Sequence, residues 1–250
     1  MLNGHGIRSH FQARRPWRDP LAPMSLIGIL EEFDDVGLAP TRFGPSENLM
    51  KPLESFTEDD IVETWMRVGG GFVQASDRWR AVVQVFFMKA PNARGVSSLW
   101  IQLNADFFDD DQRTGRFIEL CRQIYSWGAM DYGLVAYDQE YQEKNAFGPT
   151  GPFGGANLAR GLPGIYWLNF FGPFYVEWFG EDRFRSLSNV SKDQLRDGGW
   201  LIMARDEPLD YTSKEARRKE VTIMEHLGRE AFFDMSKPKK KLKIPELWEK

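Results

Sequence analysis

The stretch Phe72–Ala105, FVQASDRWRAVVQVFFMKAPNARGVSSLWIQLNA, decides the fold class. Three segments within it are rich in β-branched and aromatic residues, as is typical of strands: Phe72–Ala75, Trp79–Met88 and Leu99–Ala105. The connections between them are short and contain Asp, Asn, Pro or Gly, so they leave no room for a helical crossover. We therefore expect an antiparallel meander in the middle of the chain.

Helical patterns flank this meander on both sides. Apolar residues recur at helical spacing after Ser25 and stop at Gly37, and Ser55–Glu58 has the spacing of a capping box before a second helix. Asp109–Asp111 opens the longest predicted helix, and Ser213–Leu227 forms a closing one. Together these patterns predict an α+β fold, with a central antiparallel sheet of about five to seven strands and helices packed against it.

The two ends of the chain differ in charge from its middle. Residues 1–25 carry a net charge of +3 and residues 237–250 carry +4, so the overall −4 leaves −11 on residues 26–236. We expect residues 1–24 to be a flexible basic tail, or an over-extended start with Met24 as the true first residue. Residues 25–236 are expected to form a single α+β domain, and residues 237–250 a lysine-rich tail.

The acidic charge of residues 26–236 bears on possible partners. Such a body repels nucleic acid and attracts basic protein surfaces, although solubility alone also explains it. No apolar run is long enough to cross a bilayer, so we expect no membrane association. The predicted partner is thus another protein with a basic surface, and the oligomeric state is left open.

Residues suited to catalysis are scarce. The single cysteine, Cys121, allows neither an intramolecular disulfide nor a zinc or redox pair. Of the three histidines, His5 and His10 lie in the N-terminal tail and His226 lies near the end of a predicted helix, which argues against a histidine-based catalytic or metal site. The sequence has no nucleophile elbow, phosphate-binding loop or dinucleotide-binding glycine motif. It therefore predicts a protein that is not an enzyme, that binds no cofactor, and that works in the reducing cytoplasm.

Two groups of carboxylates are the remaining candidates for a site. They are Glu31, Glu32, Asp34 and Asp35 near the end of the first predicted helix, and Asp109, Asp110 and Asp111 at the start of the longest. The second group, together with Asp106, could bind Mg²⁺, but carboxylates also stabilise a helix start without any ligand, and no further acidic group completes a metal site. We expect both groups to belong to a partner-binding surface; a solvated helix face is the alternative.

The most distinctive segment is the aromatic run LPGIYWLNFFGPFYVEWFG at residues 162–180. It resembles a signature of the immunity protein 52 family, bacterial proteins encoded beside polymorphic toxins. Two further pieces fit this resemblance, which covers roughly residues 40–235: Asp131–Gly133 with Glu140–Tyr141, and His226–Gly228 with Phe232–Asp234.

The resemblance implies an α+β immunity protein that binds and neutralises a cognate toxin, often a nuclease, by direct contact, and it implies no catalytic residues. The signature residues then belong to the scaffold: Pro163, Gly164, Tyr166, Trp167, Asn169, Gly172, Pro173, Tyr175 and Gly180. From the residues alone, Ile165–Phe171 and Phe174–Phe179 are predicted to form two strands around a turn. The alternative functions are an interaction or assembly module of another kind, and a carboxylate-based hydrolase.

Overall fold

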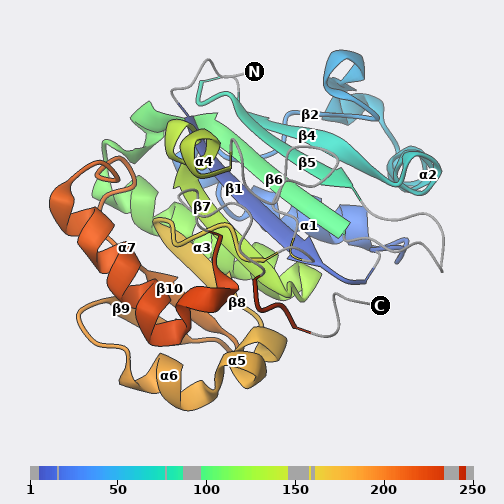
Figure 1. Ribbon diagram of the computed structural model, residues 1–250. Coiled ribbons are helices and arrows are strands. Elements are labelled where there is room, and N and C mark those ends of the chain that lie inside the picture. The colour runs from blue at the N-terminus through green and yellow to red at the C-terminus, as the bar shows by residue number, and fades with distance from the viewer. Residues whose placement is uncertain are drawn as a thin grey trace. The chain divides into compact units, whose positions relative to one another are not determined.

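The computed structural model describes residues 6–15, 17–76, 78–86, 97–145, 158, 161–233 and 242–245. The chain divides into two compact units, unit 1 (Met1–Asp131) and unit 2 (Tyr132–Lys250). Antiparallel strands and α-helices occur in both, so the predicted α+β class is confirmed (Figure 1). The described residues form ten strands, more than the predicted five to seven, because strand β1 (Gly6–Ala13) forms near the N-terminus and three short strands, β2 (Arg42–Gly44), β3 (Lys51–Pro52) and β9 (Ser191–Gln194), form in segments without a strand pattern.

Unit 1 is built on six antiparallel strands in the order β3-β2-β4-β5-β6-β1. Its elements are β1 (Gly6–Ala13), α1 (Ala22–Glu31), η1 (Asp34–Val36), β2 (Arg42–Gly44), η2 (Glu47–Leu49), β3 (Lys51–Pro52), η3 (Leu53–Ser55), α2 (Glu58–Val68), β4 (Gly70–Ser76), β5 (Ala81–Phe86), β6 (Ser97–Asn104), η4 (Ala105–Phe108) and α3 (Asp111–Gly128). The predicted meander is confirmed as β4-β5-β6. Alternate residues of β5 and β6 are buried, which gives the sheet one apolar face.

Strand β1 corrects the expectation of a flexible tail over residues 1–24. Residues 6–13 pair along their whole length with β6, and Ile7 and Phe11 are fully buried. The sequence obscured this strand because its alternate positions carry Arg8 and His10, which lie against the ring of Trp100. Residues 6–13 are therefore part of the folded unit.

The segment that follows β1 is fastened to the helices by polar contacts. Arg14 forms an ion pair with Asp131, with 2.6 Å between Nη2 and Oδ1. The indole Nε1 of Trp17 donates to the carbonyl of Gly128 at 3.0 Å, and that of Trp65 donates to the carbonyl of Trp17 at 3.0 Å. These contacts connect the chain between β1 and α1 to both α2 and α3.

Unit 2 contains four antiparallel strands in the order β7-β8-β10-β9. Its elements are β7 (Tyr132–Tyr137), α4 (Asp138–Asn145), β8 (Leu168–Phe171), α5 (Pro173–Phe179), α6 (Glu181–Ser186), β9 (Ser191–Gln194), β10 (Trp200–Met203), α7 (Lys214–Leu227) and η6 (Arg229–Ala231). The predicted tail is described only at residues 242–245, where the amide of Lys243 donates to the carbonyl of Glu230 at 2.9 Å; its remaining residues lie outside the described ranges.

The aromatic segment forms a strand followed by a helix, so the first predicted strand is confirmed at Leu168–Phe171 and the second, Phe174–Phe179, is wrong. Strand β8 ends at Phe171, Gly172 is the N-cap of α5, and Pro173 occupies the first turn, where its missing N–H costs nothing. The buried residues of α5 are Tyr175, Val176 and Phe179, whose spacing is helical. Pro173 therefore starts a helix where the sequence pattern predicts a turn.

None of the helices within the described ranges combines the length and the apolar character needed to cross a membrane.

His10 makes the stability of unit 1 depend on pH. Burial, together with the positive charge of Arg8, lowers the pKa of His10 from 6.5 to about 3. Between these values the unfolded chain binds a proton that the folded chain does not, so stability falls as pH decreases, by at most about 1.4 kcal/mol per pH unit. We expect His10→Gln to remove this part of the pH dependence, as measured by urea unfolding at pH 7 and pH 4.5.

An identical acid sensitivity in wild type and His10→Gln would contradict the assignment.

Candidate functional site

The first acidic group predicted from the sequence is exposed at the end of α1 and in η1. Glu31, Glu32, Asp34 and Asp35 are all exposed. Arg116 of α3 binds Asp35 through both Nε and Nη2, at 3.0 and 2.9 Å from Oδ2 and Oδ1, and Nη2 also donates to the carbonyl of Glu32 at 2.6 Å. This bidentate geometry fixes the carboxylate of Asp35 in one orientation and fastens the end of α1 to α3.

The second acidic group lies at the start of the same helix. Asp110 is the N-cap of α3, and its Oδ1 accepts from the amide of Arg113 at 2.8 Å. Asp109 and Asp111 are exposed on either side of it. Within the described residues no group of His, Cys, Asp or Glu is arranged to hold a metal ion, so these carboxylates do not converge on a Mg²⁺ site.

Both acidic groups therefore lie beside the N-terminal half of α3. We name the surface formed by Glu31, Glu32, Asp34, Asp35, Asp109, Asp110 and Asp111 the acidic face. Nothing in its geometry assigns a reaction to it, but it concentrates negative charge on helix ends whose backbone is held by hydrogen bonds.

The signature residues of the aromatic segment lie mostly in the interior. Residues 161–172 are buried, as is Tyr175, whereas Pro173 is exposed and Gly180 is half-buried. The side chain of Asn169 accepts from the amide of Tyr166 at 2.9 Å and donates to its carbonyl at 2.8 Å. Asn169 thus closes a buried turn and offers no group to a ligand.

A buried ionic network lies in unit 2. It consists of Glu140 and Lys144 from α4, Arg205 after β10, and Glu220 from α7. The side chains of Glu140, Arg205 and Glu220 are 0%, 3% and 8% exposed. Two carboxylates face two cations, so the charge of the network is balanced, which is the condition for burying ions at tolerable cost.

Every hydrogen-bond donor of the two cations is used. The guanidinium of Arg205 donates five hydrogen bonds: to both oxygens of Glu140, to Oε1 of Glu220 and to the carbonyls of Glu207 and Pro208. Lys144 Nζ donates to Glu140, Glu220 and the carbonyl of Ile165 at 2.6–2.8 Å. Burial raises the pKa of Glu220 above its ordinary value, against the opposing effect of Lys144.

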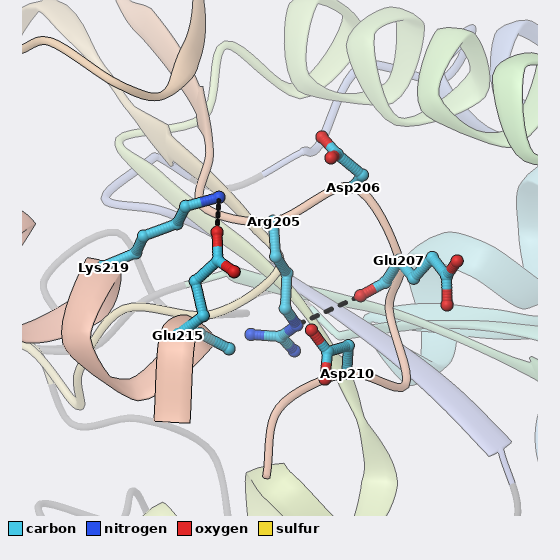
Figure 2. A pocket seen from close by; sticks show the side chains of 7 residues that line it. Arg205, Asp206, Glu207, Asp210, Glu215 and Lys219 are labelled. Atoms are coloured by element: carbon cyan, nitrogen blue, oxygen red, sulfur yellow. Dashed lines mark hydrogen bonds and ion pairs between the residues drawn. The ribbon is translucent and has the colours of Figure 1, made fainter. Parts of the chain in front are cut away.

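Beside this network the surface is hollowed. The first hollow, of about 220 Å³, is lined by Arg205, Asp206, Glu207, Asp210, Glu215, Ala216 and Lys219. Figure 2 shows Glu215 and Lys219 of α7 on one side of the hollow and the loop that carries Asp206, Glu207 and Asp210 on the other, with Arg205 between them. Carboxylates outnumber cations here, so the hollow favours a positively charged group.

A second hollow, of about 640 Å³, lies along the same helix. Its lining consists of Ser188, Asn189, Val190, Lys214, Glu215, Arg218, Lys219, Thr222 and Ile223. Val190 and Ile223 give it an apolar part, and Lys214, Arg218 and Lys219 make it basic. The volume lies within the range of sites that bind small molecules or single side chains of a partner.

Sequence reasoning missed the network and both hollows. Glu140 and Lys144 stand four residues apart, which is the spacing of a helical ion pair and was a usable signal. Nothing in the local sequence, however, relates this pair to Arg205 and Glu220, which follow Glu140 by 65 and 80 positions. Asp206 and Asp210 also belong to no sequence motif that would have indicated the first hollow.

Arg205 should therefore be more important for stability than any exposed arginine. In Arg205→Met the carboxylates of Glu140 and Glu220 lose their buried partner, so we expect the free energy of unfolding to fall by about 3–5 kcal/mol. The matched control is Arg185→Met, which removes an exposed partner of Glu181, with side chains 61% and 42% exposed, and should cost far less. Chemical denaturation followed by circular dichroism measures both, and equal losses would contradict the structural role of the network.

The comparisons with known proteins concern the fold. No family model matches the chain, and no curated protein is similar to it in sequence. Among solved structures, the chain is similar to the Pseudomonas aeruginosa T6SS protein PA0821, with 13% identity and a TM-score of 0.63, over 88% of this chain and 72% of that one. At this identity the likeness shows a shared fold, and the resemblance to the immunity protein 52 family stays a prediction.

Proposed function

We propose that this protein is a bacterial immunity protein that binds and neutralises a cognate toxin through direct contact. A nuclease is the class of toxin that we favour. Two independent likenesses support the proposal. The segment 162–180 resembles the signature of the immunity protein 52 family, and the fold is shared with a protein whose name places it in T6SS, the type VI secretion system. The first implies a toxin as the partner, and the second is a likeness of fold to a protein of a bacterial secretion system.

The observation that carries the proposal is the acidic face of unit 1. All of its acidic residues except the half-buried helix cap Asp110 are exposed, and Arg116 fixes Asp35 and the end of α1 in one orientation. A toxin that cleaves nucleic acid needs a basic surface for phosphate groups, and complementary charge accelerates association with such a surface. A fixed arrangement also lowers the entropy that is lost on binding.

Function without catalysis is part of the same proposal. The buried charged groups Glu140 and Arg205 bond to each other and belong to the network that joins α4 to α7. The exposed carboxylates Asp109 and Asp111 flank a helix cap. Each of these groups thus has a structural or surface role that requires no substrate, which favours a binding protein over a carboxylate-based hydrolase.

The proposal predicts the effect of charge reversal on the acidic face. The triple variant Glu31→Lys, Asp34→Lys and Asp109→Lys changes exposed residues and should leave folding intact. We expect it to weaken binding to the toxin domain encoded beside the gene at least tenfold, mainly through slower association, because long-range attraction to a basic surface is lost. Surface plasmon resonance at two salt concentrations measures the rates, and co-expression with the toxin measures protection.

The matched control carries the same change of charge elsewhere in unit 1: Glu47→Lys, Glu54→Lys and Glu63→Lys, all at exposed positions. It should retain binding and protection. If the wild-type protein neither binds nor neutralises any toxin encoded beside it, the proposal is wrong, and a stable homo-oligomer without a toxin would then favour an assembly module.

A further inference from the structure

The two hollows of unit 2 adjoin each other on α7. Glu215 and Lys219 line both of them, and the two side chains form an ion pair in which Nζ and Oε1 are 3.1 Å apart. This pair therefore forms the wall between the hollows. With side chains 77% and 35% exposed, the pair lies at the surface, where an incoming partner can displace it at little cost.

The two hollows differ in chemistry. Asp206, Glu207 and Asp210 give the first one an excess of negative charge. The second combines apolar groups, among them Val190, with the basic side chain of Arg218 and its neighbours. A partner that fits both must place a cation and an apolar group close together, and a partner that is uniformly basic or uniformly acidic fits only one of them.

Both flanks of α7 are held in position by cations. On one flank Arg205 binds the carbonyls of Glu207 and Pro208 and so holds the loop of the acidic hollow. On the other flank Lys192 Nζ donates to the carbonyls of Phe184 and Leu187 at 2.7 and 2.6 Å, which holds the chain just before residues 188–190. The backbone on both sides of α7 is thus held in place before a ligand binds, which lowers the entropy that is lost on binding.

Apolar side chains are also exposed in these same elements. Leu209 lies two residues after Glu207 in the loop that lines the first hollow, and its side chain is 43% exposed. Val221 of α7 is 44% exposed. Large exposed apolar residues next to a preformed hollow are a common composition of protein-binding surfaces, where an apolar contact surrounds a buried charged anchor.

We infer that α7 and the loops on its two flanks form a docking surface for a polypeptide segment of the partner in which a Lys or Arg side chain stands next to an apolar one. The basic side chain enters the hollow lined by Asp206, Glu207 and Asp210, and the apolar one enters the hollow that contains Val190. The identification of this segment as part of the toxin rests on the proposed function; the recognition chemistry does not.

A random peptide library displayed on phage tests the recognition chemistry without any toxin. Wild-type protein is the bait, and peptides that bind it are counter-selected on the double variant Asp206→Lys and Glu207→Lys. We expect enriched peptides to carry Lys or Arg beside a Leu, Ile, Val, Phe or Met, and synthetic copies to bind the double variant at least tenfold more weakly. An absence of enriched peptides, or peptides that bind both proteins equally, would overturn the inference.

Two further variants locate the contact. Thr222→Trp fills the second hollow without changing the charge and should abolish peptide binding, whereas Glu177→Lys with Asp182→Lys repeats the double charge reversal at exposed positions outside both hollows and should have no effect. Thermal unfolding confirms that each variant is folded.

The same variants, tested against the toxin domain, separate the two hypotheses. Weaker toxin binding by Asp206→Lys with Glu207→Lys supports the docking surface and the proposed function together. Peptide binding that depends on both hollows, in a protein that binds no toxin, supports the surface and contradicts only the toxin as its partner. Toxin binding that is unaffected by these variants contradicts the toxin as the occupant of this surface and leaves the proposed function intact.

Discussion

Unit 2 depends on the burial of one guanidinium, that of Arg205. A charge in an apolar interior costs several kcal/mol unless partners replace its lost hydration. Arg205 has such partners on α4, on α7 and in its own loop, so these three segments cannot move apart without exposing or isolating a charge. The shape of the surface beside α7 is therefore a consequence of an interior electrostatic constraint.

Unit 1 is stabilised mainly by apolar burial and not by a buried ion pair. Its sheet buries a continuous apolar set that includes Val83, Val85, Leu99 and Ile101, and burial of this kind contributes about 1.5–3 kcal/mol for each large side chain. The ion pair of Arg116 with Asp35 is half-exposed and contributes at most about 1 kcal/mol. In this unit the ion pair fixes the orientation of surface groups, and burial of the apolar side chains of the sheet provides most of the free energy of folding.

Local patterns predicted the elements that local interactions determine. The alternation of β5 and β6 was readable because every second residue enters the core. Helix α2 was found, although its capping box is Thr57 with Asp60 and not the overlapping Ser55–Glu58. Strand β1 and the network around Arg205 were not readable, since β1 pairs with a strand some ninety residues away and the network joins residues far apart in the chain. The exposure of most acidic residues near α3 could be predicted from the sequence, but their link through Arg116 could not.

Within the proposed function, the two surfaces act at different distances. Exposed carboxylates such as those of the acidic face attract a basic partner over about 8–10 Å, the screening length in physiological salt, and so affect mainly how often the partner arrives. The hollows beside α7 act only on contact, because a charge and an apolar group must both match, and so affect how long the partner stays. An inhibitor needs both properties, since it must reach a toxin before the substrate does and then remain bound.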